Sequence, residues 1–130
     1  MEQIQVKITK DLPKEQIKDF EDKVVHFAAI FTREYTKGMM AYPHLTGELE
    51  QQEIKAPVKR VGHGAYTLLD GVDYAKYVWK MTNVNWTNER TQPQWYKSVY
   101  KAREKTIISK AETKALGELK WQNKILKIKI

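Results

Sequence analysis

The sequence predicts an α+β fold: an antiparallel β-sheet of about four strands, two long helices packed on one face of it, and a short third helix. Polar and apolar residues alternate near both ends, two stretches repeat apolar residues at helical spacing, and a glycine-rich turn separates two shorter segments. The chain has 130 residues, of which 42% are hydrophobic and 30% charged. This balance is typical of a globular protein, and we expect residues 1–130 to form a single domain.

The first strand is expected at residues 3–9, where Ile4, Val6 and Ile8 occupy alternate positions. A long helix is then expected from Pro13 to about Gly38, since proline is tolerated in a first helical turn and glycine readily ends a helix. Its large apolar residues recur every three or four positions and form one face: Ile17, Phe20, Val24, Phe27, Phe31 and Tyr35.

A hairpin is expected in the middle of the chain. Residues 48–60 show a weak alternation and are predicted as a strand, with Pro57 at an edge or bulge. Gly62 and Gly64 give the backbone the freedom that a tight turn needs. The second arm of the hairpin is therefore predicted at residues 65–69.

The second half of the chain is predicted to contain a short helix at residues 74–81, for which a strand is the alternative, and an exposed polar loop at 82–92. Pro93 opens a second long helix that is expected to end at Gly117. Residues 121–130 then alternate again and predict the last strand, in which lysines separate Leu126, Ile128 and Ile130.

Catalytic and metal-binding patterns are weak. The chain has no cysteine, which excludes disulfides, thiolate nucleophiles and cysteine-ligated metals. His26, His44 and His63 are isolated from one another and none has a partner at ligand spacing. Glu48 and Glu50 form an acidic pair, but on an alternating strand they would share one solvated face. We therefore expect no enzyme activity, cofactor or metal.

The charge of the chain permits contact with nucleic acid. Its formal net charge is +7, and four basic residues lie close to aromatic ones in the predicted last helix. A basic nucleic-acid-binding module is therefore the alternative function. The same residues could instead form the solvated basic face of an amphipathic helix that has no role in binding. The residues concerned are Lys101, Arg103, Lys105 and Lys110, with Trp95, Tyr96 and Tyr100 nearby.

Aromatic residues and methionine cluster around Trp79. Tyr77, Trp79, Met81 and Trp86 are residue types enriched where proteins bury surface against partners, and packing in the core is the alternative. No stretch approaches the roughly 18 apolar residues of a membrane span, and no signal peptide is recognisable, so a cytosolic location is expected at first.

Three segments appear in a characteristic order: AYPHLTGEL at 41–49, GVDYAKYV at 71–78 and PQW at 93–95. In this order they resemble the head-tail joining and tail-completion proteins of tailed bacteriophages, often called minor capsid proteins. That family has a long helix, a P-x-x-T-G-x-L turn, a Y-A-x-x-V segment and a proline-led final helix. The resemblance covers residues 13–116 through short motifs. One departure is that residues 79–81 read WKM, where the family commonly has an acidic residue and a glycine.

The resemblance implies a non-enzymatic virion subunit in a ring at the neck or the head-proximal end of the tail, through which DNA passes without sequence-specific contacts. Its partners would be copies of itself and neighbouring neck or tail proteins, without a membrane. Such a protein would reside in the host cytoplasm before assembly and in the virion afterwards. Residues 39–64 and 79–94 are the candidate contact regions. The predicted interface residues are Tyr42, Leu45, Leu49, Tyr77, Trp79, Met81, Trp86 and Trp95.

Overall fold

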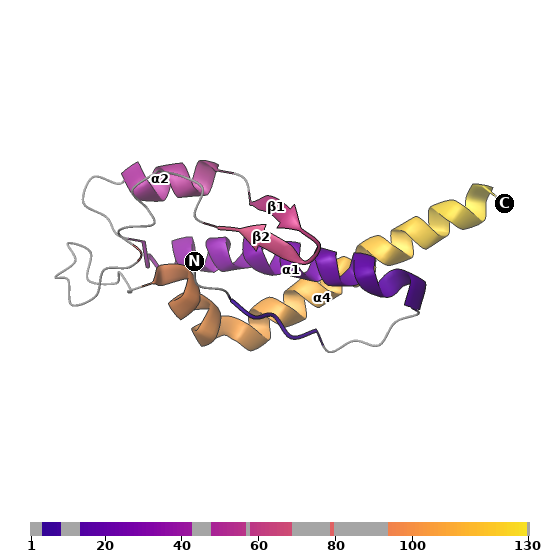
Figure 1. The fold of residues 1–130 in the computed structure, drawn as a ribbon, viewed down its shortest axis with the longest axis horizontal. Coiled ribbons are helices and arrows are strands. Elements are labelled where there is room, and N and C mark those ends of the chain that lie inside the picture. The colour runs from indigo at the N-terminus through magenta and orange to yellow at the C-terminus, as the bar shows by residue number, and fades with distance from the viewer. Residues whose placement is uncertain are drawn as a thin grey trace.

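A computed structural model describes residues 4–8, 14–42, 48–56, 58–68, 79 and 94–129. In chain order the elements are helix α1 (Lys14–Gly38), helix α2 (Glu48–Lys55), strand β1 (Lys59–Gly62), strand β2 (Ala65–Thr67) and helix α4 (Trp95–Lys129) (Figure 1). The α+β class is confirmed, but the fold is mostly helical. Within the described ranges the sheet has two antiparallel strands, fewer than the four predicted.

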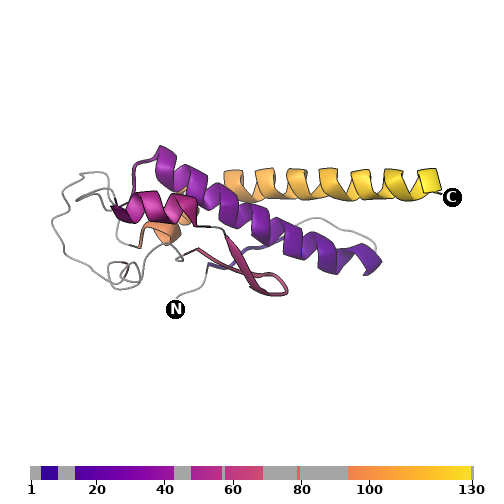
Figure 2. The same ribbon diagram turned by 90° about the horizontal axis from the view of Figure 1, so that it is seen from above.

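Helix α1 has the extent that the sequence predicts, and its apolar stripe packs on α4. Phe20, Val24 and Phe27 are buried in one cluster with Ile107 and Ala111 of α4. Figures 1 and 2 show the two helices crossing along this contact, with the hairpin lying on α1. The main core thus lies between the two helices, whereas the sequence predicted that both would pack on a sheet.

Charged side chains border the contact between α1 and α4. Lys23 Nζ lies 3.3 Å from a carboxylate oxygen of Glu118. Lys114 Nζ lies 4.8 Å from the centre of the Phe27 ring, an arrangement in which the cation is attracted by the ring face. These contacts cover the rim of the apolar core while the charged groups remain near water.

Residues 48–55 form helix α2, so the strand predicted at 48–60 is wrong over most of its length. The burial pattern explains the helix: Leu49 and Glu53, four residues apart, are buried, while Gln51, Gln52 and Ile54 are exposed. Residues at i and i+4 lie on one face of a helix. The residues that are buried in this segment are therefore not the ones that the weak apolar alternation predicted.

The predicted hairpin is confirmed between β1 and β2. Lys59 lies opposite Thr67, and Gly62 opposite Ala65, with an irregularity between Arg60 and Gly62. Gly64 in the turn has a φ of 63°, the left-handed region that glycine adopts without steric cost. The second arm is shorter than expected, because β2 ends at Thr67.

Helix α4 continues through Gly117, where the sequence predicted its end. A Cβ atom at this position would meet no neighbouring atom within 4 Å. The backbone of residues 121–129 is also helical, which contradicts the strand predicted at 121–130. The helix bends at Arg103, whose φ of −122° and ψ of 18° are not helical. Its last turns extend beyond the start of α1 (Figures 1 and 2).

Residues 4–8 are extended, and Ile4, Val6 and Ile8 are half-buried against the core while Gln5 and Lys7 are exposed. The predicted alternation is present, but these residues are not assigned as a strand. The hydroxyl of Tyr100 donates a 3.2 Å hydrogen bond to the Gln5 carbonyl. The helix predicted at 74–81, apart from Trp79, and the loop predicted at 82–92 lie outside the described residues.

Candidate assembly interface and its supporting network

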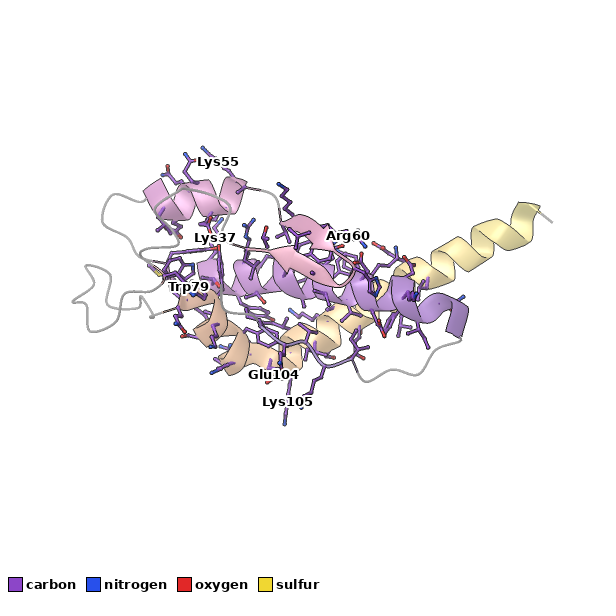
Figure 3. All side chains as sticks on the ribbon, in the orientation of Figure 1. Lys37, Lys55, Arg60, Trp79, Glu104 and Lys105 are labelled. Carbon is purple, nitrogen blue, oxygen red and sulfur yellow. The ribbon has the colours of Figure 1, made fainter. Side chains whose placement is uncertain are left out.

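An aromatic cluster fills the end of the molecule where α1 ends and α4 begins. Trp79 and Trp95 meet edge to face with ring centres 5.0 Å apart, and Tyr42 meets Tyr96 in the same way at 5.6 Å. Edge-to-face packing stabilises a pair of aromatic rings by more than the burial of their surface alone. Figure 3 shows Trp79 near the Lys37 end of α1 and the first turn of α4. The cluster thus joins segments that are far apart in the sequence.

A chain of buried hydrogen bonds crosses this cluster. The Tyr96 hydroxyl donates to the Glu53 carboxylate at 2.8 Å. The hydroxyls of Tyr42 and Tyr96 are 3.0 Å apart. Because the single proton of Tyr96 is directed to Glu53, the hydroxyl of Tyr42 acts as the donor to Tyr96. Glu53 thereby holds α2 against the start of α4.

Arg33, in the last turns of α1, links three segments. Its guanidinium donates hydrogen bonds to the carbonyl of Ala56, just after α2, and to the carbonyl of Leu68, just after β2. Its side chain is buried, and backbone carbonyls at element ends would otherwise need water or another donor. Both ends of the segment that contains the hairpin are therefore held by one side chain.

The tyrosines of the network are kept neutral by burial. Loss of solvation raises the pKa of Tyr42 to about 12 and that of Tyr96 further. A charged phenolate would lie beside the Glu53 carboxylate, which opposes ionisation in both residues. These hydroxyls therefore act as structural hydrogen-bonding groups at neutral pH.

Asp22 of α1 anchors the tip of the hairpin. Its carboxylate accepts hydrogen bonds from the Gly64 N–H at 2.8 Å, the Tyr66 hydroxyl at 2.7 Å and the Arg60 Nε at 3.1 Å. Burial by itself would raise the pKa of Asp22, but the bonds from Gly64, Tyr66 and Arg60 outweigh it and lower the pKa below its usual value. Figure 3 shows Arg60 on the hairpin above α1.

An apolar cavity of about 510 Å³ lies beside the hairpin. Val25, Ala28, Ala29 and Thr32 of α1 line it, at positions i, i+3, i+4 and i+7. The hairpin contributes Val61 and residues 64–68, and Ile4, Val6, Trp79, Tyr96 and Tyr100 complete the described lining. This second face of α1, made of small residues, was not recognised in the sequence because the larger residues of the first stripe dominate its periodicity.

The three histidines have separate surroundings. The His26 ring stacks on that of Tyr66, with centres 4.7 Å apart and planes 5° from parallel. His63 Nε2 lies 3.4 Å from a Glu21 carboxylate oxygen at the surface, and His44 lies outside the described residues. Within the described part of the chain, no group of three acidic, histidine or cysteine side chains is placed to hold a metal ion.

The basic and aromatic residues of α4 occupy different faces. Lys101, Arg103, Lys105 and Lys110 are exposed, whereas Trp95, Tyr96 and Tyr100 are buried. Figure 3 shows Glu104 and Lys105 pointing away from the body near the bend of the helix. The aromatic rings are thus not placed to stack on bases beside the lysines.

Four of the predicted interface residues lie in the aromatic cluster: Tyr42, Leu49, Trp79 and Trp95 are buried within the chain. In this structure they act as core residues. For Trp79, packing in the core was the alternative to the predicted interface role. Leu45, Tyr77, Met81 and Trp86 lie outside the described residues, so their assignment stays a prediction. The large apolar side chains that the described surface exposes are Met40 at 50%, Ile54 at 41% and Val61 at 60%.

The charged residues that join the elements, namely Asp22, Arg33 and Glu53, were not predicted from the sequence. Asp22 and Arg33 do not belong to the apolar stripe of α1, and charged residues outside such a stripe are usually solvated. Glu53 stands four residues after Leu49, a spacing that would have indicated a shared helical face. That signal was obscured by the strand interpretation of residues 48–60.

Comparisons with known proteins identify no relative: no family model, no curated protein and no solved structure matches the chain. In the described ranges, none of the helices combines the length and the hydropathy needed to traverse a lipid bilayer.

Proposed function

We propose that this chain is a non-enzymatic structural subunit of a tailed-phage virion or prophage, which joins head and tail as part of a neck or tail-completion ring. The observation that carries the proposal is the apolar cavity beside the hairpin, which the exposed Val61 helps to line. An exposed apolar side chain at the edge of an apolar cavity is a common feature of surfaces that bind other proteins. The chain would complete its packing against copies of itself and neighbouring neck or tail proteins.

The charged residues of the interior support a structural role. Asp22, Arg33 and Glu53 come from different positions in the chain, and each hydrogen-bonds a residue of another segment. These contacts fix the hairpin and α2 on the two long helices. They provide a rigid support for contact surfaces, which is what a ring subunit requires.

The order of segments that resembles the head-tail joining proteins also has a spatial counterpart. Tyr42 and Leu49 belong to the first of these segments and Trp95 to the third, and all three side chains meet in the aromatic cluster. A shared position in the core is expected of segments that define one fold. This agreement supports the proposal, and with it a location in the host cytoplasm before assembly and in the virion afterwards.

Nucleic-acid binding is the second candidate function, favoured by the exposed Lys101, Arg103 and Lys105 on α4. Because Trp95, Tyr96 and Tyr100 are buried, this mode would consist of phosphate contacts without base stacking. Such binding should weaken steeply with added salt. In the proposed ring, these residues would contact passing DNA without reading its sequence.

The proposal is tested by deleting the gene from a phage or prophage that encodes the chain. Electron microscopy of the lysate should then show filled heads and complete tails that are not joined, and a plasmid copy should restore joined particles. The matched pair for complementation is Val61→Glu, expected to fail, and Gln51→Glu at an exposed position of α2, expected to succeed. Joined, infectious particles in the deletion strain would contradict the proposal.

A further inference from the structure

Two lysines of α4 lie over aromatic rings of α1. Lys110 Nζ is 5.1 Å from the centre of the Tyr35 ring. Lys114 Nζ is 4.8 Å from the centre of the Phe27 ring and 5.8 Å from that of Phe31. The negative face of an aromatic ring attracts an ammonium group in this position. These two cations and three rings follow the contact between the helices, and we call them the basic seam.

The rings hold the ammonium groups of the basic seam without using their hydrogen-bond donors. A lysine on an open surface samples many rotamers, and it loses this freedom when it binds a ligand. In Lys110 and Lys114 the contact with a ring restricts the side chain before any ligand arrives. The attraction to a ring face is electrostatic, so the N–H groups directed away from the ring stay available. Both residues are exposed, and an anion can therefore approach them from solvent.

The charge of the basic seam is not neutralised by the described residues. In the ranges that the structure describes, neither Lys110 nor Lys114 forms an ion pair. Glu118, one turn further along α4, is engaged by Lys23 at 3.3 Å. Glu34 of α1 is exposed and shares the side of Phe27 and Phe31 by helical spacing. Two fixed cations therefore face one carboxylate, which leaves an excess of positive charge.

The arrangement of the two lysines suits the backbone of a nucleic acid. Lys110 and Lys114 are separated by about 6 Å along the axis of α4. A nucleic acid presents phosphates at short, regular intervals along its whole length, and lysine binds phosphate as a point charge. An acidic protein would have to place two carboxylates at the required interval by its own fold. The net charge of +7 adds a long-range attraction for a polyanion.

The basic seam lies on a different face of α4 from the exposed cations at the bend. Lys105 points away from the body of the molecule (Figure 3). Lys110, five residues later, instead reaches the Tyr35 ring of α1. Figures 1 and 2 show α4 beyond the bend and the hairpin on different sides of α1. A ligand on the seam would therefore leave the hairpin free for contacts with other proteins.

We propose that the basic seam binds the phosphate backbone of a nucleic acid strand. One phosphate accepts hydrogen bonds from the Lys110 ammonium, and a neighbouring phosphate accepts them from the Lys114 ammonium. Phe27, Phe31 and Tyr35 are positioning residues, because they hold the ammonium groups at a fixed separation. Contacts to phosphate alone do not read the base sequence. The inference rests on the second function proposed above, nucleic-acid binding, and extends its contact from the bend of α4 to the seam.

Fluorescence anisotropy with a labelled DNA duplex of mixed sequence tests the contact on the full-length chain. In the double variant Lys110→Gln/Lys114→Gln, the affinity is expected to fall about tenfold or more at physiological ionic strength. The slope of log affinity against log salt should become shallower by about 2, because each phosphate contact releases about 0.9 of a counterion. The matched control is Lys55→Gln/Lys59→Gln, which removes the same charge from exposed positions on α2 and β1. Equal weakening in both double variants would overturn the inference.

Single variants test the roles of the carboxylate and the ring. Glu34→Gln removes the opposing charge and should tighten DNA binding about threefold, whereas Glu21→Gln at the hairpin tip should change it less. Tyr35→Leu keeps both lysines but removes a ring, and it should weaken binding about threefold. Tyr35→Phe keeps the ring and should bind as the original chain does. Circular dichroism melting identifies any variant that does not fold. Unchanged affinity in both Glu34→Gln and a folded Tyr35→Leu would contradict the assignment.

Lysine acetylation followed by mass spectrometry gives an independent readout on the original chain. Bound DNA should protect Lys110 and Lys114 from the reagent and leave Lys55 and Lys59 reactive. A competition experiment separates nucleic acid from an acidic protein as the partner. Polyglutamate that displaces the duplex as effectively as unlabelled DNA of equal charge would favour the acidic protein and overturn the inference.

Failure of the seam can be distinguished from failure of the proposed functions. DNA binding that depends on Lys101 and Lys105, but not on Lys110 and Lys114, refutes the seam and leaves nucleic-acid binding in place. Absence of DNA binding by the original chain refutes both. The joining of heads to tails is decided separately, by the deletion experiment described above.

Discussion

The Tyr96 hydroxyl donates a 2.8 Å hydrogen bond to the Glu53 carboxylate, and the two side chains are 1% and 0% exposed. This bond joins the start of α4 to α2, a helix that otherwise contributes Leu49 to the core. A buried carboxylate is costly unless it is hydrogen-bonded or paired with a positive charge. The position of α2 therefore depends strongly on this polar contact.

Replacing Tyr96 by phenylalanine should lower the free energy of unfolding by about 1–3 kcal/mol, because Glu53 loses a donor and Tyr42 loses its acceptor. The measurement is equilibrium unfolding in urea. Tyr42→Phe is the matched control and should cost less, since it leaves the bond to Glu53 intact. Equal stability of Tyr96→Phe and the original chain would show that the bond does not support the fold.

The anchor at Asp22 should make stability depend on acidity. Its pKa is lowered in the folded state, so its stabilising contribution is present above the unfolded pKa and is lost as the pH falls through the folded value, below about pH 4. Asp22→Asn should therefore be less stable at neutral pH and lose less stability on acidification. Thermal unfolding at a series of pH values measures both effects.

The control for this experiment is Asp19→Asn in the same helix. Asp19 is about half exposed and lies 3.7 Å from Lys23, an ion pair of the kind that contributes little at a surface. Its replacement should leave the acid transition nearly unchanged. An identical acid transition in Asp22→Asn and the original chain would argue against the anchor.

Gly117→Ala should stabilise the protein by about 0.5–1 kcal/mol, because alanine restricts the unfolded chain and favours the helix. The added Cβ has open space at this position. Gly64→Ala is the opposite case, since its φ of 63° is unfavourable for alanine, and it should destabilise. Differential scanning calorimetry measures both. A loss of stability in Gly117→Ala would indicate that the helix ends there, as its sequence first suggests.

At alkaline pH, the tyrosine hydroxyls should ionise late and with loss of structure. Burial raises the pKa of Tyr42, Tyr66 and Tyr100 to about 12, with the Asp22 carboxylate adding to the effect at Tyr66. Their raised pKa values imply that stability is complete below about pH 10 and is lost as the pH rises toward 12. Phenolate absorbance and circular dichroism, followed together, measure this. Ionisation of every tyrosine near pH 10 with retained helicity would contradict it.

The sequence predicted elements whose local pattern and tertiary environment agree. Helix α1 follows from its apolar spacing and the hairpin from Gly62 and Gly64, and both are confirmed. The strand prediction for residues 48–55 was wrong because their apolar alternation is weak and the buried Glu53 is charged. The alternation at 121–130 predicted a strand, but the backbone of 121–129 is helical. Alternation alone does not report whether a neighbouring strand is present, and a strand needs one to pair with.

The candidate site was harder to predict than the fold. Arg33 reaches carbonyls at Ala56 and Leu68, and Tyr96 reaches Glu53, across long separations in sequence. Periodicity reports which face of a helix is buried, but it does not report which distant polar groups meet there. Trp79 illustrates the limit: its residue type suggested either core or interface, and its burial against Trp95 decides for the core in this structure.

The attachment of the hairpin to α1 at two points determines how the molecule can flex. Asp22 fixes the hairpin at its tip and Arg33 at its base, and these residues are about 16 Å apart along the same helix. With both ends fastened, the hairpin cannot pivot relative to α1, so the two move as one rigid body. Helix α4 beyond its bend packs on the opposite side of this unit through Ile107, Ala111 and Ala115, so the hairpin, α1 and this part of α4 together form one support.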